Sequence, residues 1–228
     1  MRRPSNSGFT LVEVLVVLVT LVVLAGLLYP LRRRDNSKHL DFRCLNNIKN
    51  VGLAHKIFAM DNMGHFPMEI PMREGGSREW LTNTADLWRH FDVLSNELVI
   101  PRLLVCPADR TRTAASHFRN SMGPQGGVPF SGNSQLSYFL NLDARSSSGD
   151  TPLCGDAQMM MGGAPTSAGE LRVDRSTDLR FARGLHHETG NLAFADGSGR
   201  RIRSRDLSST VRKGLAQSGR PTNLWILP

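Results

Sequence analysis

The chain has 228 residues, a formal net charge of +8 at pH 7 and three cysteines. This length suffices for one well-cored domain plus a stalk. The charge would suit a nucleic-acid-binding protein, but residues 30–60 carry +5 of it and residues 61–228 only +2. Most of the excess positive charge therefore lies in residues 30–60, and a second basic stretch lies at 200–220. Because the charge is not spread over the rest of the chain, nucleic acid is not expected as a partner.

The amino terminus joins a short polar leader to a long apolar run. Arg2 and Arg3 precede the sequence Gly-Phe-Thr-Leu-Val-Glu at residues 8–13, and an almost purely apolar segment follows as far as Tyr29. As a helix, residues 9–29 would be about 32 Å long, which matches a hydrocarbon core of roughly 30 Å. A cleaved secretory signal has a shorter apolar region of about 7–15 residues. The sequence therefore predicts a membrane-spanning helix.

Glu13 is the one charged residue inside this apolar run. A single charge near the bilayer centre costs roughly 2.5–3.5 kcal/mol, and such residues usually mark a function. Pairing with an opposite charge would make the carboxylate tolerable. The alternative is that Glu13 reaches the membrane interface, because it lies only about one turn inside the run.

Residues 31–61 have the pattern of an amphipathic helix. Apolar residues recur at intervals of three and four, at Leu40, Cys44, Ile48, Val51 and Phe58. His55 falls on the same face, and we interpret it as a core residue. Pro30 removes one backbone hydrogen bond, so it should bend or break the helix. We expect a leader at 1–8, a transmembrane helix at 9–29, a stalk helix at 30–61 and a globular head at 62–228.

The head is predicted to mix helices and strands. Helical spacing covers residues 85–98 and 204–217, and Gly219 should end the second helix. Residues 159–169 have the composition of a loop, and Asp196-Gly197 indicates a two-residue hairpin turn. Strands are expected at 102–106, 136–140, 152–155, 190–195, 198–202 and 223–227.

Cys44, Cys106 and Cys154 have no metal-ligand spacing. In an exported head the compartment would allow a disulfide, and Cys44 with Cys106 is the preferred pair. Three buried thiols are an equally good interpretation, since sequence does not fix the connectivity.

The amino-terminal residues resemble the signal of type IV prepilins and pseudopilins. The resemblance implies that prepilin peptidase cuts between Gly8 and Phe9, that Phe9 is then methylated, and that Glu13 pairs with the amino group of a neighbouring subunit to set the register. It also implies that Pro30 lets the apolar half of the helix bend, and that the leader is cytoplasmic. Three arginines after the span point the other way under the positive-inside rule: Arg32, Arg33 and Arg34.

Scattered blocks of the head resemble a prepilin-type family named for a histidine, nine residues and then Asp-Gly. Here His186 is followed after nine residues by Asp196 and Gly197. Weaker blocks include Cys-Leu-Asn-Asn at 44–47 and Cys-Pro-Ala-Asp at 106–109. Ser-Gly-Arg after Asp-Gly departs slightly from the family's pattern.

Together these resemblances imply a pilin-like α+β fold, in which a long amino-terminal helix packs on a small antiparallel β-sheet head. The expected protein is a structural, non-enzymatic subunit of a type II secretion or type IV pilus-like filament. Its partners would be prepilin peptidase, other pseudopilin subunits and an inner-membrane assembly platform. It would cross the inner membrane once, with a cytoplasmic amino terminus and a periplasmic or extracellular head.

Other functions have less support in the sequence. A minor tip subunit or adhesin would use its head to bind DNA, polysaccharide or a secreted substrate, through a surface such as 200–220. A membrane-tethered enzyme would need catalytic groups, and His186 with Asp196 is the best pair available. That pair has no recognised zinc spacing, so no metal and no cofactor are expected. Calcium is conceivable from the five aspartates of 143–178, although no EF-hand loop is present.

Overall fold

The computed structural model describes residues 10–28, 36–119 and 126–228. The chain divides into two compact units, residues 1–39 and residues 40–228. Three predicted positions lie outside the described residues: Gly8, Phe9 and Pro30.

Helix α1 (Leu11–Leu28) begins with a capping box. The backbone N–H and the hydroxyl of Thr10 donate to Glu13 Oε2, at 2.8 and 3.0 Å, and the backbone N–H of Glu13 donates to Thr10 Oγ1 at 3.3 Å. These bonds satisfy backbone groups that have no partner inside the first turn. Glu13 therefore has a local role as a helix cap, in addition to the charge pairing expected from the sequence. Within the described residues, no helix is long and apolar enough to cross a membrane.

Helix α2 (Asn36–Asp61) presents one face to the core of the head. Cys44, Ile48 and Val51 are fully buried, and so is His55 one turn later. This face is the one that the amphipathic pattern predicts. The helix ends in a turn at Gly64, whose positive φ of 86° suits glycine.

The head is built on a six-stranded sheet in the order β5-β9-β1-β2-β7-β8, and every neighbouring pair is antiparallel. A second, three-stranded sheet has the order β4-β3-β6. The strands of the large sheet are β1 (Tyr138–Asn141), β2 (Pro152–Asp156), β5 (Gly169–Asp174), β7 (Thr189–Phe194), β8 (Gly199–Arg203) and β9 (Thr222–Leu227). Those of the small sheet are β3 (Met159–Met161), β4 (Ala164–Pro165) and β6 (Leu179–Phe181).

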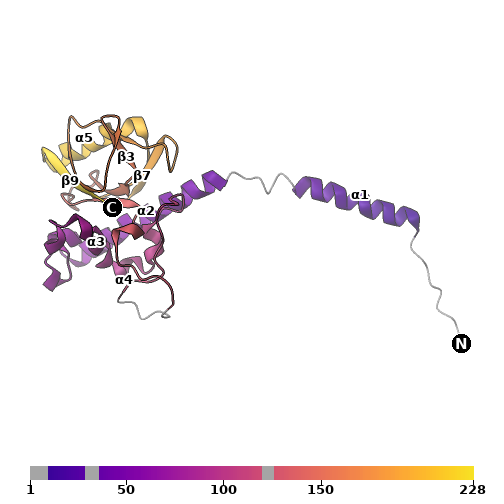
Figure 1. Ribbon diagram of the computed structural model, residues 1–228, viewed down its shortest axis with the longest axis horizontal. Helices are drawn as coiled ribbons and strands as arrows, with labels where there is room; N and C mark the ends of the chain where they lie inside the picture. Colours follow the sequence, from indigo (N-terminus) through magenta and orange to yellow (C-terminus); the bar gives the residue numbers. More distant parts are fainter. Residues whose placement is uncertain (1–9, 29–35, 120–125) are drawn as a thin grey trace. The chain divides into compact units, whose positions relative to one another are not determined.

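The large sheet separates two hydrophobic cores, because successive strand residues face opposite sides. Ala193 belongs to the core that contains α2, whereas Leu192 and Phe194 belong to the other core. The second core is closed by α5 (Leu207–Ser218) and includes Trp225 stacked on Phe139, with ring centroids 4.2 Å apart. Figure 1 shows α5 on one side of the strands, with α2 and α3 (Leu87–Asp92) on the other.

Several local expectations need correction. Residues 102–106 are not a strand, since Pro101 begins a short 3-10 helix (Pro101–Leu104). The predicted loop at 159–169 contains the hairpin β3–β4. The helix at 85–98 is interrupted, so that α3 and α4 (Ser95–Leu98) are separate. The predicted strands at 136–140, 152–155 and 223–227 are confirmed, with ends shifted by one or two residues.

Two histidines are buried in the core beside α2. The His55 ring lies edge-on to Phe66 and Phe91, with centroids 6.1 and 5.8 Å away, and its Nδ1–H donates to the Val51 carbonyl at 2.9 Å. Burial lowers the pKa of His55 to about 4. Burial also lowers the pKa of His90 to about 4, helped by repulsion from His55. Both side chains are therefore neutral in the folded head at neutral pH.

We expect the head to lose stability as the pH falls from about 6.5 to about 4. The unfolded state binds protons on these histidines near pH 6.5 while the folded state does not, so acid favours unfolding. Because burial lowers the pKa of His55 to about 4, this residue alone should make the free energy of unfolding at pH 4 roughly 3 kcal/mol smaller than at neutral pH. Urea unfolding at several pH values measures the slope of the unfolding free energy against pH. His55→Gln should flatten it and His39→Gln, at an exposed site, should not; an unchanged slope in His55→Gln would contradict the assignment.

Candidate functional site

The hairpin β7–β8 lies directly against helix α2. A Cβ atom at Gly52 would come within 2.7 Å of Ala193 Cβ, and one at Gly199 would come within 2.7 Å of Lys49 Cβ. Such distances are shorter than any normal carbon–carbon contact, so glycine is what allows the helix and the hairpin to approach this closely.

His186 lies just before β7 and is buried. Its Nδ1–H donates to Asp41 Oδ1 at 2.8 Å, and Arg201 Nη1 donates to the other oxygen of the same carboxylate at 3.3 Å. Asp41 is on α2, so the hairpin binds the first part of that helix through two side chains.

Asp196 and Gly197 form the opposite end of the hairpin. The backbone N–H of Phe194 donates to the Ser198 carbonyl at 2.9 Å, so residues 195–197 form a three-residue loop, with Gly197 at a φ of 86°, rather than the expected two-residue turn. Asp196 Oδ1 accepts the backbone N–H of Ser198 at 2.8 Å. A Cβ atom at Gly197 would lie 3.3 Å from Lys56 Cβ, so this end also packs on α2.

The two halves of the histidine–Asp-Gly pattern therefore do not meet. His186 and Asp196 flank β7 at its two ends. His186 bonds to Asp41 in the first part of α2, and Gly197, next to Asp196, packs on Lys56 further along the helix. We interpret the spacing as structural: one extended strand separates two points of attachment on one helix.

A compact polar cluster surrounds His186. Cys44 of α2 and Cys106 form a disulfide, with Cα atoms 5.1 Å apart, which is the pairing preferred from sequence. His186 Nε2 lies 3.2 Å from Cys106 Sγ and 3.6 Å from Asp156 Oδ2. Cys154 is a buried free thiol.

Asp156 is the most unusual member of this cluster because its carboxyl group is almost fully buried. Its Oδ2 accepts the backbone N–H of Asn191 at 2.7 Å and the side-chain amide of Asn191 at 3.1 Å. Within the described part of the chain, its Oδ1 has no hydrogen-bond partner. Burial raises the pKa of Asp156, and the nearby His186 opposes that shift.

The other aspartates considered for calcium have individual partners. Asp143 accepts from Arg220 at 2.6 Å, Asp150 from Arg200 at 3.0 Å, and Asp178 lies 3.6 Å from Arg180. Asp174 accepts from the hydroxyls of a turn, Ser176 and Thr177, and these bonds lower its pKa to about 2. Among residues 10–28, 36–119 and 126–228, the one group with metal-ligand geometry is Cys44, Cys106 and His186.

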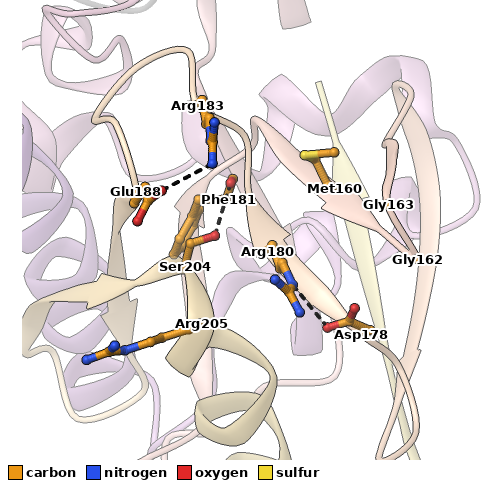
Figure 2. Close-up of a pocket in the computed structure, with 10 residues that line it drawn as sticks. All are labelled: Met160, Gly162, Gly163, Asp178, Arg180, Phe181, Arg183, Glu188, Ser204 and Arg205. Carbon is orange, nitrogen blue, oxygen red and sulfur yellow. Dashed lines mark hydrogen bonds and ion pairs between the residues drawn. The ribbon is translucent and has the colours of Figure 1, made fainter.

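A cavity of about 630 Å³ opens between β6, the β3–β4 turn and the short 3-10 helix (Ser204–Asp206) that precedes α5. Figure 2 shows its charged side chains lying in pairs, Arg183 with Glu188 and Arg180 with Asp178, at 3.3 and 3.6 Å. The third arginine, Arg205, is 3.9 Å from an oxygen of Asp206. The cavity therefore offers no concentrated charge for binding an ion.

The basic stretch at 200–220 is partly neutralised by acids in the same way. Its ion pairs are Arg200 with Asp150 and Asp196, Arg201 with Asp41, Arg203 (at 2.8 Å) and Arg205 with Asp206, and Arg220 with Asp143. Arg212 and Lys213 are exposed and form no ion pair with the described residues. A surface of paired charges is a poor match for a polyphosphate backbone.

Comparison with known proteins identifies the amino-terminal segment. Residues 3–29 match the family model of the prokaryotic N-terminal methylation motif. This match is consistent with a prepilin-type signal, and it contains Gly8, Phe9 and Glu13. No curated protein and no solved structure matches the chain significantly. The resemblance of the head to the histidine–Asp-Gly family stays a prediction.

We expect Gly52→Val to destabilise the head by about 2 kcal/mol, because overpacking a close contact of this kind typically costs 1–3 kcal/mol. The new side chain would collide with Ala193 of β7. Thermal and urea unfolding followed by circular dichroism measure the change. Gly126→Val is the control, since a Cβ atom there has no neighbour within 4 Å. Equal stability of Gly52→Val and the unaltered chain would show that α2 does not need this approach to the hairpin.

Proposed function

We propose that the chain is a pseudopilin-like structural subunit. It is cut by prepilin peptidase between Gly8 and Phe9, methylated on Phe9, and assembled into a type II secretion or type IV pilus-like filament. The match of residues 3–29 to the N-terminal methylation motif is the observation that carries this proposal.

The surface of α1 supports assembly through this helix. Leucines and valines are exposed on all its sides, from Val14 at 49 % to Leu11 at 81 %. A helix that is apolar all round is stable only inside a membrane or among other apolar helices. The 18 residues of α1 measure about 27 Å, and the whole segment 9–29 would measure about 32 Å, close to the hydrocarbon thickness.

Helix α2 has a second apolar stripe that the head does not cover. Phe42 is 63 % exposed, and Leu53, Ile57 and Met60 continue along the same side at 46, 39 and 74 %. This stripe suits contact with neighbouring subunits. The α+β head, with a helix packed on an antiparallel sheet, is consistent with a pilin-like fold.

The proposed location is the inner membrane, with the amino terminus in the cytoplasm and the head outside it. A disulfide between Cys44 and Cys106 favours export, because disulfides persist in oxidising compartments. Other subunits of the filament and an inner-membrane assembly platform are the proposed partners. We propose no enzymatic role, and the paired arginines of 200–220 give no support to a DNA-binding tip subunit.

Gly8→Glu should abolish processing, because the peptidase reads the glycine before the cut. Intact mass and amino-terminal analysis of protein from its own membranes measure this. The unaltered chain should begin at a methylated Phe9, and the variant should keep residues 1–8. A shortened product from the variant would contradict the proposed cut.

Glu13→Ala should be processed normally but should enter filaments poorly. Because Glu13 also caps α1, its two roles need separate variants. Glu13→Gln keeps the N3 side chain of the capping box but removes the negative charge. We expect both variants to be cleaved and both to be depleted from sheared filaments. Normal assembly of Glu13→Gln would show that capping, and not charge pairing, is what assembly requires.

A further inference from the structure

We propose that Cys44, Cys106 and His186 form a zinc site when the two cysteines are thiols. The disulfide and the metal site are then alternative cross-links at one place in the head. This inference does not depend on the proposed function, since it uses only the described residues of the head.

The donor atoms are already close enough to share one ion. The three candidate ligand atoms lie within 4.8 Å of one another, and His186 Nε2 is 3.2 Å from Cys106 Sγ. In a tetrahedral site with Zn–S of about 2.3 Å and Zn–N of about 2.0–2.1 Å, neighbouring donors are roughly 3.5 Å apart. The backbone can therefore stay in place while the two sulfurs separate after reduction.

His186 is held in the form that binds a metal. Asp41 accepts the Nδ1–H at 2.8 Å, so the second ring nitrogen, Nε2, is the one directed at the sulfurs. A carboxylate behind a histidine in this way fixes the tautomer and increases the basicity of the ligand. Arg201 in turn binds Asp41 at 3.3 Å.

Asp156 provides the independent sign of a missing cation. It is 2 % exposed, its Oδ2 lies 3.6 Å from His186 Nε2, and its Oδ1 has no partner among the described residues. An unsatisfied buried carboxylate oxygen is costly unless a cation or a donor completes it. Asp156 lies beside the group of three ligand atoms without belonging to it, so a water held by Asp156 would take the fourth position.

The charges balance well around a divalent ion. Two thiolates carry two negative charges against the two positive charges on zinc, and the outer pair of Asp41 and Arg201 is neutral. Thiolate and imidazole donors are the set that zinc prefers in closed structural sites. Burial of all three ligands suits such a site better than a catalytic one.

The chemistry of loading is a simple exchange. A phosphine reductant gives two electrons to the S–S bond, which breaks; water supplies the oxygen of the phosphine oxide and the two protons of the new thiols. Zinc binding then releases both thiol protons to solvent.

The test uses the full chain, purified in detergent and kept free of metal with a chelator. Zinc is titrated in competition with a coloured chelator, once into the oxidised protein and once into protein reduced with a phosphine. Cobalt(II) is added in a parallel experiment, because thiolate coordination gives it a strong charge-transfer absorption. We expect reduced protein to bind one ion with thiolate–cobalt absorption, and oxidised protein to bind none at this site.

Variants then assign the ligands. Cys44→Ser and His186→Ala should weaken binding by more than roughly 100-fold, and Asp41→Asn and Asp156→Asn by roughly 10–100-fold. Cys154→Ser is the matched control, since this thiol is buried but outside the group, and it should bind normally. Far-UV circular dichroism checks that each variant is folded.

Two results would overturn the proposal. One is the absence of zinc binding in reduced, folded, unaltered protein, a comparison that requires no variant. The other is binding that Cys44→Ser leaves intact, or that the oxidised protein shows equally, since either would place the ion elsewhere.

Discussion

The packing of α2 against the hairpin β7–β8 is the contact on which the rest of the head depends. The helix contributes Cys44, Ile48 and Val51 to the first core, which also contains residues of the sheet such as Ala193. Small residues on both sides, Gly52 and Ala193, allow the approach. The disulfide and the pair of Asp41 with His186 then fix the position of the helix along the strand.

Local signals in the sequence predicted most of the regular structure. The apolar face of α2, the strands β1, β2 and β9, and α5 with its Gly219 end all follow from periodicity and from turn residues. The failures have local causes as well. Residues 102–106 have the apolar composition of a strand, yet Pro101 suits the first turn of a helix and cannot donate to a ladder. In the predicted loop at 159–169, Gly162 and Gly163, both at positive φ, allow the turn of a short hairpin.

The amino-terminal signal and the cluster around His186 differ in how far apart their residues lie in the sequence. The proposed processing signal is continuous in sequence, so Gly8, Phe9 and Glu13 could be predicted without a structure, and the matched segment, residues 3–29, contains all three. The capping of α1 by Thr10 and Glu13 has an equally local signature, Thr-x-x-Glu. It was not predicted, because Glu13 was interpreted only as a charge inside an apolar run. The cluster around His186 could not be found in this way, because its contacts join residues 145 and 80 positions apart.

The disulfide also changes how the chain would respond to force. Cys44 and Cys106 are separated by 62 positions, and the segment between them includes most of α2 and the whole of α3 and α4. Tension that enters the head along α2 passes at Cys44 through the sulfur atoms to Cys106 and continues toward the sheet. This covalent path bypasses the enclosed segment, and a protease cut within it would leave both pieces covalently joined.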